Sequence, residues 1–132
     1  MTAVIKLTIL GQAYSKANSR KIVSFGNRPA IIKSQKARCF EQSALLQIPE
    51  HAKQMIDRPV AVTMNIFYAS NRPDLDESVI LDVLQARFKG SGKERVCVRR
   101  GVYVNDRLVK EKHIYHGIDK MNPRAEIEVR LI

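Results

Sequence analysis

Three aspartates stand where their carboxylates could bind one metal ion together. Asp74 and Asp76 are two residues apart, so on an extended segment both side chains point to the same side, roughly 6–7 Å apart at the backbone. Asp106 follows a separate apolar stretch and could be brought beside them by the fold. Oxygen ligands without Cys or His favour Mg²⁺ over zinc, and Mn²⁺ can substitute. The same acids could instead only stabilise a helix start, and both interpretations stay open at this point.

The spacing of these residues excludes several other phosphate and metal motifs. An EF-hand loop counted from Asp74 needs Gly and Glu where the chain has Val79 and Gln85. A DxDx[TV] phosphatase motif needs Thr or Val where Ser78 stands. The triplet Lys110-Glu111-Lys112 has the wrong order for the [DE]xK of restriction-like nucleases. No GxxxxGK[ST] sequence is present, so we expect no P-loop and no nucleotide cofactor.

The charge of the chain predicts an anionic partner. Its 132 residues include 23 Lys and Arg against 13 Asp and Glu, a formal net charge of +10, and the first acid is Glu41. Nucleic acid is the anionic partner that such a balance suggests first. We expect DNA phosphates to be bound by the basic residues of segments 16–38 and 89–100: Lys16, Arg20, Lys21, Arg28, Lys33, Lys36, Lys93, Arg95, Arg99 and Arg100.

Length and composition predict one domain over residues 1–132. With 45% hydrophobic residues the chain can bury a core, so general disorder is not expected. No run approaches the about 18 apolar residues of a membrane span, and the N-terminus lacks the features of a signal peptide. The two cysteines, Cys39 and Cys97, are too few for a disulfide framework. A cytoplasmic protein without a membrane partner is therefore expected.

The hydrophobic pattern predicts an α+β fold. Alternating apolar residues predict strands over 5–9, 60–69 and 125–131, with the second in the centre of the sheet. Apolar residues at helical spacing predict helices over 34–48 and over 76–88. The predicted architecture is a small mixed β-sheet with two main helices packed mainly on one face.

Three further segments complete this outline. Residues 11–33 are rich in Gly, Asn and basic side chains and predict a long basic loop or a loose hairpin. Residues 89–100 combine two glycines with five basic residues and predict a basic loop or a hairpin tip. Residues 108–116 predict a further strand.

Taken together, these residues resemble the RusA family of Holliday-junction resolvases. That family carries a DLD motif ahead of a helix, and Asp74-Leu75-Asp76 stands in that position. It also carries a (W/Y)-h-(D/N)-D-x-x-V stretch, where h is apolar, which residues 103–109 fit as YVNDRLV. The basic loop at 15–20 and the helix opening near Ser34 are similar to the family's N-terminal region. The resemblance therefore spans nearly the whole chain.

The resemblance implies a homodimeric, Mg²⁺-dependent endonuclease that cuts four-way DNA junctions by paired nicks, in DNA recombination and repair. Its catalytic, metal-binding aspartates would be Asp74, Asp76 and Asp106. A bacterial, phage or prophage origin would match the usual distribution of the family.

Two positions depart from the family pattern. The family usually has Asn after the second Asp, and here Glu77 could add a fourth carboxylate. The family's catalytic helix lysine falls at Ile80 or at Ser78, depending on which end of the motif is aligned. The candidates to replace it are, in order, Lys110, Lys112 and Lys89. The insertion 89–100 is also longer than the family pattern predicts.

We therefore expect phosphodiester hydrolysis, in which a metal-bound water attacks a phosphate held between carboxylates and basic residues. Two alternatives stay open. One is a non-catalytic nucleic-acid-binding protein whose acids only stabilise helix starts. The other is a metal-dependent nuclease that acts on other branched or single-stranded DNA.

Overall fold

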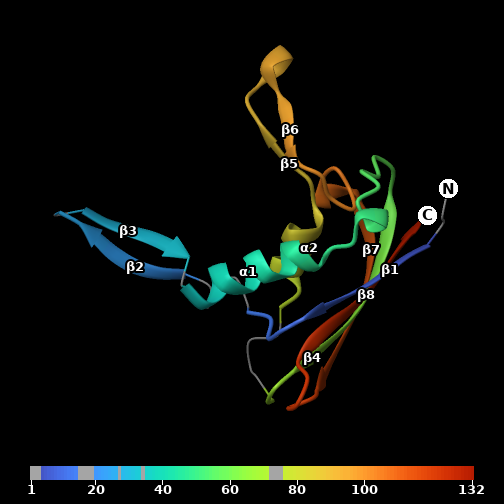
Figure 1. Ribbon diagram of the computed structural model, residues 1–132, viewed down its shortest axis with the longest axis horizontal. Coiled ribbons are helices and arrows are strands. Elements are labelled where there is room, and N and C mark those ends of the chain that lie inside the picture. Colours follow the sequence, from blue (N-terminus) through green and yellow to red (C-terminus); the bar gives the residue numbers. More distant parts are fainter. Residues whose placement is uncertain (1–3, 15–19, 27, 34, 72–75) are drawn as a thin grey trace.

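The chain folds around a four-stranded mixed sheet, with both α-helices on the same face (Figure 1). This computed structural model describes residues 4–14, 20–26, 28–33, 35–71 and 76–132. The strand order is β1 (Val4–Leu10), β8 (Arg124–Leu131), β4 (Val60–Tyr68) and β7 (Val109–Ile118). β4 runs antiparallel to β8 and parallel to β7. The structure confirms the predicted α+β class.

The central strand β4 lies where its alternating sequence predicts. Val60, Val62, Met64, Ile66 and Tyr68 are all buried, because successive side chains of a strand point to opposite faces. They pack with the inward-facing residues of β8 and β1, which are Ile5, Leu7, Ile9, Ala125, Ile127 and Val129. The apolar side chains of three strands thus form one continuous layer beneath the helices.

Two helices cover this layer. α1 (Gln35–Gln47) buries Ala37, Phe40 and Ala44, which recur at the three- and four-residue spacing of a helix face. Pro49 follows its end and leads into the short 3₁₀ turn η2 (Glu50–Ala52). α2 (Ser78–Leu84) is apolar around most of its surface and is correspondingly the more deeply buried helix. Within the part of the chain that the structure describes, no helix combines the length and apolar character needed to cross a membrane.

The predicted extension of the second helix to Phe88 is wrong. α2 ends at Leu84, and Gln85 is already extended, with φ −83° and ψ 152°. The backbone N–H of Ala86 donates to the carbonyl of Tyr103 at 2.9 Å, while Val102 donates to Leu84 at 2.8 Å. This short pairing takes the backbone groups that a longer helix would have used. It also joins the end of α2 to the segment that leads to Asp106.

Both basic segments are hairpins that project from the body in different directions (Figure 1). β2 (Arg20–Phe25) pairs antiparallel with β3 (Arg28–Lys33), within the predicted loop 11–33. β5 (Arg87–Lys89) pairs antiparallel with β6 (Val96–Arg99), and the short 3₁₀ turn η3 (Gly92–Glu94) closes their tip. The second hairpin rises directly from the end of α2. The predicted strand at 108–116 is β7, which begins at Val109 and continues to Ile118.

Candidate functional site

Asp106 and Asp82 line one small cavity, although they are far apart in sequence. The cavity of about 210 Å³ opens between α2, the 3₁₀ turn η4 (Asp106–Leu108) and the start of β7. It is lined by two carboxylates, an ammonium group, a hydroxyl group and two apolar side chains: Ser78, Leu81, Asp82, Asp106, Val109 and Lys112. The lining therefore brings both signs of charge to one small hollow.

Local hydrogen bonds position Asp106 at the edge of the cavity. It is the first residue of η4, and the side chain of Asn105 caps this turn by accepting from the N–H of Arg107 at 2.9 Å. The N–H of Asp106 itself donates to the side-chain oxygen of Gln85 at 3.0 Å. Gln85, which directly follows α2, therefore holds the backbone of η4, the turn that carries the carboxylate of Asp106.

Tyr103 links α2 to the segment that leads into η4. Its side chain is completely buried, and its hydroxyl donates to the carbonyl of Leu81 at 2.6 Å. Burial raises the pKa of Tyr103 well above its usual value, and the carboxylates of Asp106 and Asp82 raise it further. Burial and both carboxylates thus favour the neutral phenol, whose O–H donates the hydrogen bond to α2.

Asp82 is a site residue that the sequence prediction left without a role. It follows Asp74, Asp76 and Glu77 closely in the sequence, and its distance of four residues from Ser78 is the signal that could have found it, because residues four apart share one helix face. Asp82 also lines a second cavity, of about 330 Å³, whose wall includes Glu41, Arg87 and Arg99. It therefore lies between the candidate catalytic cavity and the foot of the β5–β6 hairpin.

Asp76 serves the start of α2. Its Oδ1 accepts a hydrogen bond from the N–H of Ser78 at 2.9 Å, and its own N–H donates to the hydroxyl of Tyr68 at 3.4 Å. Such a contact to the residue two positions ahead is a common way for Asp to begin a helix. Asp74 lies outside the described residues, so the predicted pairing of Asp74 with Asp76 on an extended segment stays a prediction.

Of the three candidate lysines, the structure places Lys112 at the cavity. Lys112 lies opposite the buried Val62 of β4, which directs it to the helix-covered face of the sheet. Its Nζ is 3.4 Å from Oε1 of Glu77, at the N-terminus of α2. Lys110 is exposed and does not line the cavity, and Lys89 lies on the β5–β6 hairpin. Glu77, predicted as a possible fourth metal ligand, is the partner of this lysine.

The structure describes the predicted DNA-binding residues to different extents. Lys16 lies outside the described residues; for Arg20, Lys21, Arg28 and Lys33 only the backbone of β2 and β3 is described. Lys36 on α1 and Lys93 and Arg95 on the hairpin are exposed, and Arg99 is half-buried at the hairpin foot. Arg100 is exposed and also contacts the body of the protein, because its guanidinium donates to the carbonyl of Lys53 at 2.7 Å and lies 3.6 Å from Glu50.

Carboxylate donors of this kind match magnesium better than zinc. Among the described residues, no three His, Cys, Asp or Glu side chains lie close enough together to form a metal site, and Asp74 is not among those residues. Mg²⁺ is usually bound through one or two carboxylates, with waters and phosphate oxygens completing its octahedral shell. Asp82 and Asp106 are two carboxylates that line one cavity together with the ammonium group of Lys112.

No family model matches this chain, and no curated protein matches it in sequence.

Proposed function

We propose that this protein is a Mg²⁺-dependent, structure-selective endodeoxyribonuclease that resolves four-way DNA junctions. One observation carries the proposal: Asp82, Asp106 and Lys112 surround one cavity beside the foot of a basic hairpin. Carboxylates repel DNA, so a protein that only bound phosphate would lose affinity by placing them there. A protein that holds a divalent cation against a phosphodiester needs both kinds of charge together.

The residues of the cavity have separate roles in this proposal. Asp106 and Asp82 would hold the metal, and Asp74 would add a third carboxylate. Asp76, whose carboxylate accepts from the N–H of Ser78, would complete the acidic set from the start of α2. A bound Mg²⁺ lowers the pKa of a coordinated water and neutralises charge on the scissile phosphate. Lys112, oriented by Glu77, would add a second positive charge to a phosphate oxygen as negative charge develops. Tyr103 would keep α2 and η4 at a constant separation.

The substrate follows from the arrangement of basic surfaces. Two basic hairpins leave the body in different directions, so one protein could contact two DNA arms. Such phosphate contacts supply affinity and position without reading sequence. A symmetric homodimer would present two cavities to a two-fold symmetric junction, as paired incision requires. The resemblance to the RusA family supports the same substrate.

A second candidate function has a specific observation in its favour. The carboxylate of Asp76 accepts from the N–H of Ser78, which is the contact expected of an acid that only begins a helix. A non-catalytic DNA-binding protein would have such acids and the same basic hairpins.

Cleavage assays separate these functions. Labelled four-way junction, flap, linear duplex and single strand would be incubated with the pure protein in Mg²⁺ and in EDTA. The proposal predicts symmetric incision of the junction in Mg²⁺, little cutting of linear duplex and no product in EDTA. Preferential cutting of flaps or single strands would instead indicate the other nuclease, and binding without any metal-dependent product would indicate the DNA-binding protein.

A further inference from the structure

The outer part of the β5–β6 hairpin carries exposed apolar side chains among basic ones. Val96 and Val98 expose 56% and 51% of their surface, although valine is usually buried. Val98 is the extra residue of β6 between the Phe88–Cys97 and Arg87–Arg99 pairs, so it forms a bulge beside Val96. Lys89 is directly opposite Val96 and shares its face of the ribbon. We call the exposed surface of Val96 and Val98 the valine face.

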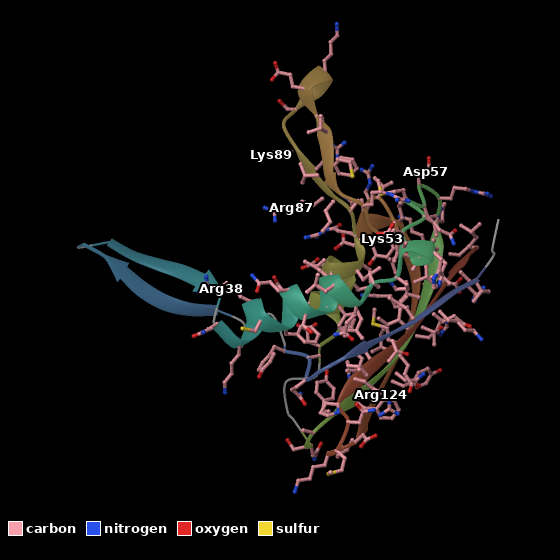
Figure 2. All side chains as sticks on the ribbon, viewed as in Figure 1. Arg38, Lys53, Asp57, Arg87, Lys89 and Arg124 are labelled. Carbon is pink, nitrogen blue, oxygen red and sulfur yellow. The ribbon has the colours of Figure 1, made fainter. Side chains whose placement is uncertain are left out.

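The opposite face of the hairpin has a different character. The guanidinium of Arg95 lies 4.2 Å from the centre of the Phe88 ring, and Cys97 is paired with Phe88 across the ribbon. Arg95 thus covers the one aromatic ring of the hairpin, which stiffens the ribbon and leaves the valines as its uncovered apolar surface. Figure 2 shows Arg87 near the foot of the hairpin and Lys89 farther along it.

The positive charge of the β5–β6 hairpin favours an anionic partner. Residues 87–99 contain Arg87, Lys89, Lys93, Arg95 and Arg99 against one acid, Glu94. A second copy of the same ribbon would bring like charge against like charge, so self-association through the valine face is disfavoured. A polyanion that also presents apolar groups fits both features. Duplex DNA has this chemistry, because its major groove displays thymine methyl groups between two phosphate backbones.

We propose that the β5–β6 hairpin enters the major groove of a DNA arm with Val96 and Val98 against thymine methyl groups. A two-stranded β-ribbon fits the width of that groove. Lys89 on the valine face and Lys93 at the tip reach the flanking phosphates, while Arg87 and Arg99 remain beside the cavity that Asp82 lines. This inference adds a preference for thymine-containing arms to phosphate contacts that carry no sequence information. It rests on the proposed function only in that the ligand is DNA, because groove binding needs no metal and no cleavage.

The test measures binding in EDTA, by fluorescence anisotropy at one fixed salt concentration. The probes are two duplexes of identical A·T-rich sequence, one with thymidine and one with deoxyuridine, which lacks the methyl group. Proteins are the wild type, the double variant Val96→Ser, Val98→Ser and the matched control Leu46→Ser, which changes a side chain on α1 that is 88% exposed. All three substituted side chains are exposed, so each variant is expected to fold, and thermal melting checks this.

We expect the wild type to bind the thymidine duplex several-fold more tightly than the deoxyuridine duplex. The double variant should bind the thymidine duplex about tenfold more weakly than wild type and no longer distinguish the two probes, since each lost apolar contact weakens binding several-fold. Leu46→Ser should match wild type. Equal binding of both probes by the wild type, or wild-type affinity in the double variant, would overturn the inference.

The outcomes for the inference and for the proposed function are distinguishable. Methyl-dependent binding without Mg²⁺-dependent incision would refute the nuclease and leave the groove-binding hairpin. Mg²⁺-dependent incision by a protein whose DNA affinity does not depend on the valines or the methyl groups would refute the groove-binding hairpin and leave the nuclease. A wild type that binds no DNA would refute both, and a loss of dimer in the double variant with unchanged DNA binding would reassign the valine face to self-association.

Discussion

The ammonium group of Lys112 lies 3.4 Å from the carboxylate of Glu77, beside the cavity that Lys112 shares with Asp106. The pair joins an edge strand of the sheet to the start of α2. A strand thus brings a lysine to the cavity beside the N-terminus of α2. Lys112 is therefore the residue that we expect to act on the phosphate.

Replacing this lysine should impair chemistry more than binding. We predict that Lys112→Gln lowers the rate constant for junction cleavage by about 10²–10³, because a preorganised charge is lost at the scissile phosphate. Stability should change by less than about 1 kcal/mol, since the ion pair is partly exposed. Single-turnover cleavage measures the rate, with Lys110→Gln as the neighbouring control. Similar losses in both variants would show a general charge effect instead.

Tyr103 predicts a specific pH dependence of stability. Burial and two nearby carboxylates raise its pKa in the folded protein, whereas the unfolded chain releases the proton near pH 10. Above about pH 10 the unfolded state binds fewer protons than the folded state, so stability falls as pH rises. Tyr103→Phe should lose about 1 kcal/mol at neutral pH, for the missing bond to Leu81, and decline less than wild type in alkali.

Urea unfolding midpoints at about pH 7 and about pH 11 would test this prediction. Tyr115→Phe, which alters a 58% exposed tyrosine on β7, is the matched control and should follow wild type at both pH values. A Tyr103→Phe protein that declines as steeply as wild type would contradict the assigned role of the buried phenol.

Gly101 should tolerate no side chain. A Cβ there would lie 2.7 Å from the carbonyl oxygen of Leu84 and would also collide with the backbone of Gln85 and Ala86. Gly101→Ala should therefore destabilise the protein by about 3 kcal/mol, because the end of α2 and the segment before Asp106 must separate. In Gly117→Ala, the added Cβ meets only the ring of Phe67, which can move. Thermal melting compares the two, and equal shifts would contradict this account of the close backbone approach.

DNA binding should depend steeply on salt. Each phosphate neutralised by a basic side chain contributes a slope of about −0.9 to the log–log dependence of the affinity on salt for duplex DNA. Lys93→Gln at the hairpin tip should make the slope less steep by about that amount. Lys120→Gln, in the turn between β7 and β8, should leave it unchanged. A salt slope that is flat in the wild type would remove the basis for assigning the hairpins to DNA.

The sheet was accessible to sequence reasoning because its strands alternate clearly. Val60 to Tyr68 and Ala125 to Leu131 carry apolar residues at every second position, and both are strands of the sheet as that pattern indicates. The end of α2 was not accessible, because the apolar spacing continues past Leu84 to Phe88. The helix ends because the backbone pairs with Tyr103, eighteen residues beyond Gln85. The spacing of nearby apolar residues does not indicate such a long-range contact.

The candidate site likewise has residues that the sequence could predict and residues that it could not. Asp106 could be found from its motif, and the structure places it at a cavity. Spacing shows that Asp82 shares a helix face with Ser78, but it does not show that this face of α2 is turned to the cavity. Lys112 reaches the cavity through a register shift where β7 joins β4, which has no signal in the sequence. Arg100 has contacts that its position in a basic run does not reveal, because its guanidinium is held by Glu50 and the carbonyl of Lys53.

The most direct test of the account is cleavage of a four-way junction by the Asp106→Asn protein. This change keeps the shape of the side chain but removes the charge that would hold Mg²⁺ at the cavity. Asp57→Asn, at an exposed position that does not line the cavity, is the matched control. We predict that Asp106→Asn binds the junction as wild type does and cuts it at less than about one hundredth of the wild-type rate in Mg²⁺, while Asp57→Asn cuts normally. Wild-type cleavage by Asp106→Asn would contradict the central claim.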